Sequence, residues 1–268
     1  MTKILRISDI ETKDMLFFDA EFKEQCFKFC LQRDIEFLPS LDDSTQMYVR
    51  DDNARDFKVE LISEQRKMDG FQIAFDSRVL NAFQQNHLLF VFTEGEFSGV
   101  VHFSDFNKSI VSAYLFEVFF QYERSLRIFL HECGLRNSDI VKFFEIKVSQ
   151  AKKESSRDFY QRKIDGYLIK KAEIDKLPQF QSFYLDDLIS FANAQGNNLN
   201  IDVIELRNMI MHAHELVNME NWSADNFIFD FAAFEKFFTR AIALHHDYRK
   251  LKNKVAFLQG SDKTVSFE

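Results

Sequence analysis

The sequence is poor in the two residues that most often interrupt regular structure. Only 7 glycines and 2 prolines occur among its 268 residues. An all-β fold needs many tight turns, which these two residues supply, so their scarcity argues against such a fold and favours helices. With 46% hydrophobic and 28% charged residues, the composition is that of a globular chain with room for one large or two ordinary domains.

Cysteines and long apolar runs are also few. The three cysteines, Cys26, Cys30 and Cys133, form no Cys-x-x-Cys pair and are interpreted as free thiols in a reducing cytoplasm. The spacing of Cys26 and Cys30 on a helix predicts two buried small apolar groups. No apolar run approaches 18 residues, and the first 14 residues are too charged for a signal peptide, so a cytoplasmic protein without a membrane span is expected.

Several common catalytic motifs are absent from the sequence. It contains no Gly-x-Gly-x-x-Gly, no phosphate-loop Gly-Lys-Ser/Thr and no Gly-x-Ser-x-Gly elbow. The doublet His246-Asp247 suits a metal phosphohydrolase, but the distant partners that such a site needs are missing. No helix carries His-x-x-x-His, so no metal site is expected.

Negative charge is concentrated in the first part of the chain. Residues 1–110 hold 13 basic and 20 acidic residues, a net charge of −7, whereas residues 111–268 are almost balanced. Within the second part, Lys142 to Lys176 has a net charge of +4. This basic segment indicates either a solvated helix pair or a surface that tolerates nucleic acid.

The first part contains an internal repeat. Each copy predicts a helix, a strand, a turn and a second strand: Glu21 to Arg33, Ile35 to Leu41 and Met47 to Val49, then Asp76 to Gln85, His87 to Thr93 and Gly99 to Phe103. A shift of 52 residues superposes the two copies without a gap from Asp34/Asn86 to Asn53/Asp105. Repetition of this kind is a property of the fold rather than of a single element.

The repeated unit resembles a CBS domain, and the two copies in tandem resemble a CBS pair. The residues that carry the resemblance are Asp34 to Pro39 before the first turn, and Gly99-Val100-Val101 followed by Asp105 after the second. The resemblance implies an α+β domain over residues 1–108 and an adenine nucleotide as its small-molecule regulator. A degenerate pair that only packs and dimerises is the alternative.

Four positions correspond to the residues that end a CBS domain, a Thr or Ser followed three residues later by an Asp. Arg50 and His102 stand at the Thr positions, and Asn53 and Asp105 at the Asp positions. The resemblance implies that a nucleotide lies between the repeats, with its ribose on Asp105 and its phosphates near Arg50.

The chain from residue 109 onward is strongly helical. Apolar spacing predicts helices at Val111 to Cys133, Asp139 to Gly166, Leu185 to Ala194, Asp202 to Asn218 and Asp230 to Leu258. A loop around Trp222 precedes the last helix, and residues 261–268 are expected to be a disordered tail. An all-α bundle over residues 109–260 is therefore expected.

One of these helices combines an apolar stripe with an unusual polar face. Val203, Leu206, Ile210, Ala213 and Val217 form the stripe. Glu205, Asn208 and His212 fall on the opposite side, and Arg207 lies on the flank between them. Arginine, amide, imidazole and carboxylate on one helix indicate chemistry more than solvation.

Arg207 to His212 resembles the Arg-x4-His motif of the HEPN superfamily, in which a polar residue such as Asn208 often follows the arginine. Glu123 and Arg127 on an early helix add to the resemblance; an ordinary i,i+4 ion pair is the alternative. HEPN domains are helical, usually dimeric, and many cleave RNA without a metal. The resemblance thus implies RNA as substrate, no cofactor and a homodimer with a composite active site.

The side chains of the motif suit RNA cleavage by the RNA's own 2′-hydroxyl. Histidine, with a pKa of about 6.5, can transfer protons, so His212 is the candidate acid–base. The guanidinium of Arg207 can hold a phosphate, Asn208 can orient the histidine, and Glu205 can position Arg207.

Three classes of function remain open from the sequence. The first is an endoribonuclease, for instance a toxin or antiviral-defence effector, gated by the CBS-like domain. The second is an inactive HEPN module that binds RNA or protein. The third is a nucleotide-sensing CBS protein whose helices only dimerise.

Overall fold

A computed structural model describes residues 4–33, 35–215, 228 and 230–260, apart from the side chains of 212–215. Over these residues the fold is mixed α+β, with two three-stranded sheets followed by a helical C-terminal region. The mixed class and the helical C-terminal region agree with the prediction from the sequence, whereas the third strand of each sheet was not predicted. The loop around Trp222 and the tail 261–268 lie outside the described residues. No helix in the described part is long and apolar enough to cross a membrane.

The chain forms two compact units. The first unit comprises Met1–Tyr114 with Glu220–Phe238, and the second comprises Leu115–Met219 with Thr239–Glu268. The division passes through helices α4 (Ser109–Glu132) and α9 (Phe231–Leu258), whereas the boundary expected at residue 108 precedes α4.

Aromatic packing explains why both helices begin in the first unit. Tyr114, near the start of α4, stacks on Phe75 at 6.1 Å between ring centroids. Phe234 of α9 packs against Phe83 and Phe106 at 5.2 and 5.3 Å. The four phenylalanine rings are buried and Tyr114 is partly buried beside them, so the first turns of both helices belong to the core of the first unit.

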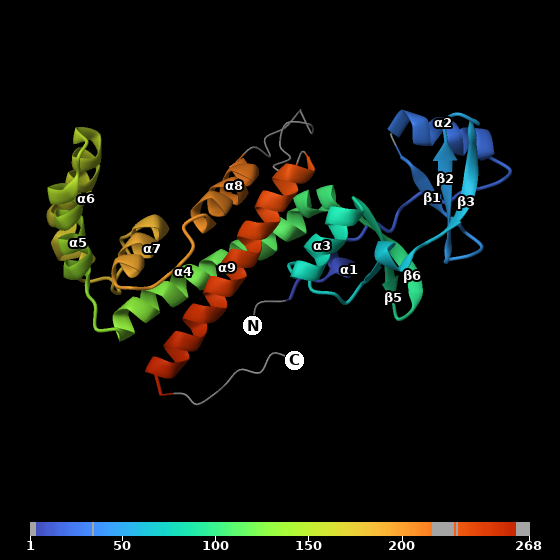
Figure 1. The fold of residues 1–268 in the computed structure, drawn as a ribbon. Helices are drawn as coiled ribbons and strands as arrows, with labels where there is room; N and C mark the ends of the chain where they lie inside the picture. The colour runs from blue at the N-terminus through green and yellow to red at the C-terminus, as the bar shows by residue number, and fades with distance from the viewer. Residues whose placement is uncertain (1–3, 34, 216–227, 229, 261–268) are drawn as a thin grey trace. The chain divides into compact units, whose positions relative to one another are not determined.

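The first unit contains both sheets (Figure 1). Its elements, in chain order, are α1 (Ile7–Ile10), α2 (Lys23–Arg33), β1 (Phe37–Pro39), β2 (Gln46–Asp51), β3 (Asp56–Leu61), β4 (Lys67–Asp69), α3 (Ser77–Gln85), β5 (Leu88–Thr93) and β6 (Glu96–His102). The sheet β1-β2-β3 is antiparallel throughout, whereas in β4-β5-β6 the strand β4 runs parallel to β5. Buried Cys26 and Cys30 attach α2 to the first sheet, as predicted.

The two hairpins of the repeat share one register. Phe37 pairs with Val49 in the first hairpin, and the residues 52 positions later, Leu89 and Val101, pair in the second. The next two pairs of β1 and β2 coincide with pairs of β5 and β6 in the same way. The internal repeat is therefore confirmed at the level of the paired hairpin.

The repeats diverge after their second strand. β2 turns at residues 52–55, where Arg55 has a φ of 52°, and continues into β3. β6 instead leads into the 3₁₀ helix η2 (Phe103–Asn107) and then into α4. Strand β3 was not predicted, although Phe57, Val59 and Leu61 alternate with Lys58 and Glu60 as in a strand with one apolar face.

Packing between the hairpins forms a shared core. Met47, Ile62 and Phe90 are buried together, and the Phe37 ring lies 5.5 Å from that of Phe90. The N-terminal segment crosses β6 so closely that a Cβ on Gly99 would lie 2.8 Å from the Thr12 carbonyl oxygen. Glycine is therefore needed at this position.

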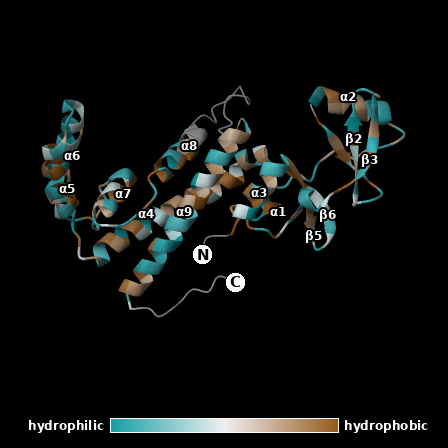
Figure 2. Cartoon of the chain, viewed as in Figure 1, coloured by the Kyte–Doolittle hydropathy of each residue, from teal (hydrophilic) through white to brown (hydrophobic). Residues whose placement is uncertain are grey.

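The second unit is helical. It contains most of α4 and α9, together with α5 (Asn137–Gln150), α6 (Glu154–Ile174), α7 (Leu185–Ala194) and α8 (Val203–Glu215). The predicted apolar residues of α4 are all buried: Leu115, Val118, Phe119, Tyr122, Leu126, Phe129 and Leu130. Figure 2 shows brown and teal residues on both α4 and α9, as expected of amphipathic helices.

The helix predicted across 139–166 is wrong in two respects. The chain breaks at residues 151–153 and forms two helices, and the second helix continues past Gly166 to Ile174. Lys153 is extended, with φ −106° and ψ 138°, and α6 packs back onto α5. This return brings the Tyr160 ring within 5.9 Å of the Phe144 ring. Burial of aromatic surface thus overrides the local preference of residues 151–153 for helix.

Candidate functional site

Helix α8 positions the candidate catalytic residues. Val203 and Leu206 are fully buried and Ile210 is almost so, which confirms the first three positions of the predicted stripe. The side chain of Ala213 and all of Val217 lie outside the described residues. Burial of this stripe fixes the rotation of the helix, and hence the direction of its polar face.

The polar positions of α8 follow from that rotation. Asn208 is exposed and Arg207 is half-buried, so both lie off the buried stripe. His212 belongs to α8, one helical turn beyond Asn208, but its side chain lies outside the described residues.

Glu205 contacts a residue that the sequence did not single out. Its carboxylate forms an ion pair with the guanidinium of Arg240 in α9, and another nitrogen of Arg240 lies 3.6 Å from the Met209 sulfur. Glu205 therefore contacts Arg240, whereas the sequence analysis assigned it to Arg207. Arg240 lies 33 positions after Arg207, on a different helix, so no local sequence pattern indicates the contact.

Glu123 and Arg127 form more than an exposed ion pair. Both side chains are about three-quarters buried, at 23% and 25% exposure. The Arg127 guanidinium also donates to the carbonyl oxygens of Phe180 and Phe183, at 3.2 and 3.3 Å. The pair thus attaches the loop before α7 to α4.

Arg50 and Asn53, the candidate ligand-binding residues of the first repeat, form hydrogen bonds within that repeat. The Arg50 guanidinium donates to the carbonyl oxygens of Cys30 and Ile35, both at 2.9 Å, and pairs with Asp52. Arg50 therefore joins the end of α2 to β2. Asn53 is exposed in the β2–β3 turn, where its N–H donates to Asp51.

The matching positions in the second repeat lie at the end of β6. Asp105 accepts the His102 N–H at 2.7 Å and contacts the Thr12 hydroxyl and the Lys108 ammonium, at 3.2 and 3.0 Å. Burial lowers the pKa of His102, whose ring bonds to Ser104. His102 and Asp105 are thus brought together, whereas Arg50 and Asn53 are held by other residues.

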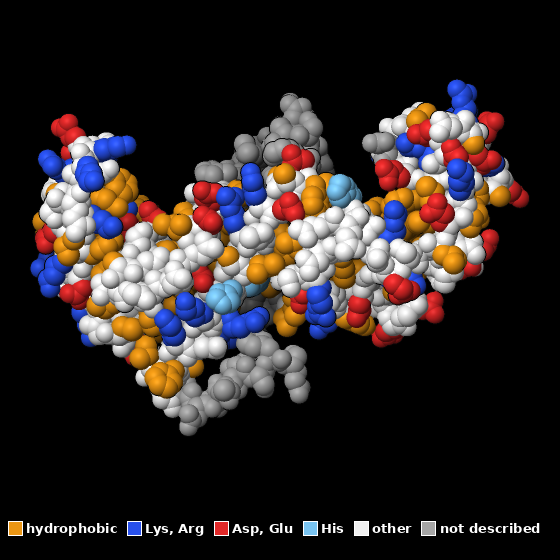
Figure 3. All heavy atoms as spheres, viewed as in Figure 1, with side chains coloured by type: hydrophobic (Ala, Val, Ile, Leu, Met, Phe, Trp, Pro, Cys, Tyr) orange, Lys and Arg blue, Asp and Glu red, His pale blue; other side chains and the backbone are white. Residues whose placement is uncertain are grey.

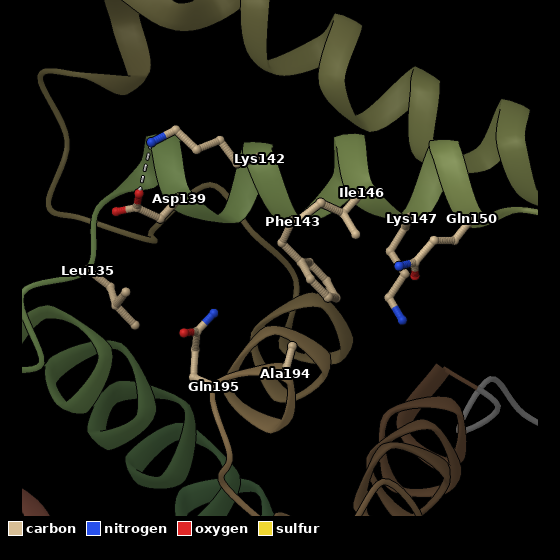
Figure 4. Close-up of a pocket in the computed structure, with 9 residues that line it drawn as sticks. All are labelled: Leu135, Asp139, Lys142, Phe143, Ile146, Lys147, Gln150, Ala194 and Gln195. Carbon is tan, nitrogen blue, oxygen red and sulfur yellow. Dashed lines mark hydrogen bonds and ion pairs between the residues drawn. The ribbon is translucent and has the colours of Figure 1, made fainter.

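A hollow of about 470 Å³ lies between α5 and the end of α7 (Figure 4). Phe143, Ile146, Lys147 and other α5 residues line one side, and Ala194 and Gln195 line the other. Basic and apolar side chains stand on the α5–α6 pair in Figure 3. The basic segment predicted from the sequence is therefore an exposed surface beside an open hollow.

Lys163 of α6 joins α6 to α7 and lies close to three aromatic rings. The Lys163 ammonium forms an ion pair with Asp187, whose side chain is only 6% exposed. It also lies 4.5, 5.8 and 5.9 Å from the ring centres of Phe159, Phe144 and Tyr184. Burial raises the pKa of Asp187, even though Lys163 opposes that shift.

Because His245 is buried in its neutral form, the protein is expected to lose stability in acid. Burial, with the nearby charge of Arg249, lowers its pKa to about 4, below the value of ~6.5 expected in the unfolded chain. The unfolded state therefore binds the proton first, and stability falls as the pH drops from ~6.5 toward 4, by about 3 kcal/mol in all. Urea unfolding at pH 7.5, 6 and 5 measures this loss, and His245→Gln should show a smaller dependence over that range. Equal slopes for the two proteins would assign the loss to other groups.

Comparison with known proteins identified no relative. No protein-family model, no curated protein and no solved structure matches this chain.

Proposed function

We propose that this protein is a metal-independent endoribonuclease of the HEPN type, with RNA as its substrate. The observation that supports the proposal best is the arrangement of α8. Its apolar stripe is buried, which leaves Asn208 exposed and Arg207 half-exposed, and Arg240 adds a second guanidinium beside Glu205. A helix that carries an arginine and an acid–base histidine, with a second arginine close to its Glu205, suits a phosphodiester substrate.

The proposed reaction is an internal transesterification. His212 removes the proton of a ribose 2′-hydroxyl, the 2′-oxygen forms a bond to the adjacent phosphorus, and the bond to the 5′-oxygen breaks. A protonated histidine, supplied by the second copy of the motif, returns a proton to that leaving oxygen. Arg207 stabilises the charge that develops on the phosphate, and Asn208 orients His212. The products are a 2′,3′-cyclic phosphate and a 5′-hydroxyl.

This scheme needs two motifs, and one chain carries one. We therefore propose a homodimer in which two copies of α8 form a composite site. The exposed basic side chains of α5 and α6 offer phosphate contacts for the RNA. DNA lacks the 2′-hydroxyl and is not a substrate in this scheme.

The substrate class is tested with labelled RNA and DNA of one sequence in excess EDTA. RNA alone should be cut, at the rate measured without EDTA. Cleavage of both substrates, or loss of activity in EDTA, would contradict the proposal. Binding of RNA without cleavage would instead indicate an inactive HEPN module.

A second proposal concerns the first unit, as a CBS-like pair that senses an adenine nucleotide and regulates the nuclease, as in a toxin or antiviral-defence effector. The shared register of the two hairpins supports it, as does the position of Asp105 at the end of β6. Arg50 is held by two backbone carbonyls. Asp105 is also engaged, by the His102 N–H, Thr12 and Lys108, so a ribose bound there replaces the Thr12 or the Lys108 contact.

Calorimetry with ATP, AMP and oligoadenylates tests the sensing role. At least one should release heat, and Asp105→Ala should weaken its binding about tenfold, because a ribose contact is lost. Asp105→Asn retains an acceptor for the His102 N–H, so it should keep the fold. Weaker nucleotide binding by a folded Asp105→Asn would therefore reflect a lost ligand contact and not unfolding. Absence of heat with every nucleotide would leave the pair a packing role only.

A further inference from the structure

Strand β3 is an open edge of the first unit. It lies at the end of the sheet β1-β2-β3 and pairs only with β2 among the described strands. The outer edges at β1 and β6 are different, because Phe18 bridges to Ser40 beside β1 and Thr12 bridges to Val100 of β6. An unpaired edge is a template for another strand.

The direction of the backbone groups of β3 follows from the ladder. The Ile62 N–H donates to the Thr45 carbonyl at 2.8 Å, and hydrogen-bonded pairs alternate along an antiparallel ladder. Lys58 and Glu60 therefore direct their backbone groups toward β2. Phe57, Val59 and Leu61 direct theirs outward, away from the sheet.

This edge is complementary to itself. If a second β3 runs antiparallel with Val59 opposite Val59, Lys58 stands opposite Glu60 of the second copy, and Glu60 opposite its Lys58. Phe57 then stands opposite Leu61, and all the outward backbone groups of these three positions find partners. The side chains are accessible for this pairing: Lys58, Val59 and Leu61 are 69%, 56% and 70% exposed. The Lys58 ammonium pairs with Asp51 of its own chain at 2.5 Å, so Glu60 of the second copy joins or replaces that contact.

Charge selects this register over its neighbours. Moving the centre to Lys58 or to Glu60 keeps outward groups opposite outward groups. These shifts place lysine opposite lysine, or glutamate opposite glutamate, which is unfavourable in directly opposed pairs. Of these three registers, only the one centred on Val59 forms two pairs of opposite charge.

We propose that β3 is the interaction surface for a second copy of this chain, which it binds by antiparallel β3–β3 pairing centred on Val59. The pairing joins two three-stranded sheets into one continuous six-stranded sheet across a two-fold axis. This interface lies in the first unit, so it does not depend on the proposed nuclease site of α8.

Cysteine cross-linking tests the register. In a hydrogen-bonded antiparallel pair the Cα atoms are about 5.5 Å apart, within the range of a disulfide. Full-length Val59→Cys, in a Cys133→Ser background that removes the exposed native thiol, should oxidise to a covalent dimer.

Two neighbouring variants in the same background are the controls. Lys58→Cys should not cross-link to itself, because in this register its two copies are diagonal neighbours about 7–8 Å apart. An equimolar mixture of Lys58→Cys and Glu60→Cys should form the mixed dimer. Absence of a Val59→Cys dimer, or equal cross-linking by Lys58→Cys alone, would overturn the proposal.

Charge reversal gives a second test without cysteine. In sedimentation equilibrium, Lys58→Glu should weaken self-association of the full chain at least tenfold, and adding Glu60→Lys should restore it. Lys28→Glu, which reverses the charge of another exposed lysine outside β3 and α8, should leave this association unchanged. If Lys58→Glu has no effect while the protein still dimerises, the copies meet at another surface and the β3 proposal is wrong.

Discussion

Asp187→Ala is expected to lower the free energy of unfolding by about 3–5 kcal/mol, because it leaves the mostly buried ammonium of Lys163 without its closest counter-charge. The ammonium then faces the three nearby aromatic rings and the more distant Asp186 carboxylate, 3.8 Å away. Chemical denaturation monitored by circular dichroism measures the change. A loss below about 1 kcal/mol would mean that water or Asp186 replaces the missing carboxylate.

The double variant Lys163→Met/Asp187→Leu is the matched control. Apolar residues of similar size remove both charges together, so the double variant should be far more stable than Asp187→Ala and near wild type. The raised pKa of Asp187 supports this expectation, since burial outweighs the attraction of Lys163 there. If the effect of changing Asp187 on the free energy of unfolding depends strongly on whether Lys163 is present, the two residues are energetically coupled.

Arg207→Ala and His212→Ala are each expected to abolish RNA cleavage. Arg207 lies off the buried stripe of α8 and the helical period places His212 off it as well, so each change should cost about 1 kcal/mol of stability or less. Leu206, by contrast, is fully buried, and Leu206→Ala should cost about 2–5 kcal/mol.

The comparison of these three variants separates chemistry from folding. Cleavage assays and thermal melts are measured on the same preparations. If His212→Ala unfolds the protein as Leu206→Ala does, the histidine is structural. If it cuts RNA at the wild-type rate, the histidine has no catalytic role.

Apolar periodicity predicted most of the helical region. The bounds of α7 coincide with the predicted 185–194, and those of α4 and α9 differ from the predicted ends by two residues or fewer. These helices carry their information locally, because buried positions recur every three or four residues. The segment predicted as one helix from 139 to 166 is the exception. Its break at residues 151–153 depends on α6 returning to α5, and α6 continues past Gly166 to Ile174.

Self-similarity predicted the hairpins because the repeated residues occupy the same register in both copies. The third strand of each sheet escaped prediction. β4 is only three residues long, too short to show a period. β3 alternates apolar and charged residues as a strand does, but it has no counterpart in the repeat on which the prediction was based. The helix α2 and the turn at Asp42 to Ser44 were found, because their signals lie within a few neighbouring residues.

The candidate site was found in the sequence only where its residues share one helix. Arg207, Asn208 and Glu205 lie within four positions, so their common helix is visible in the spacing. The ion pairs of Glu205 with Arg240 and of Asp187 with Lys163 join residues 35 and 24 positions apart. Such partners depend on how helices pack, which no local pattern records.

The central claim is that α8 supports cleavage of RNA by its own 2′-hydroxyl, and the chemical ends of the products test it most directly. Wild type and His212→Ala are incubated with end-labelled RNA in EDTA, and the fragments are treated with phosphatase before and after opening of cyclic phosphates by acid. The account predicts 2′,3′-cyclic phosphate and 5′-hydroxyl ends from wild type, and intact RNA from His212→Ala. Fragments with 5′-phosphate ends, or cleavage by both proteins alike, would contradict it.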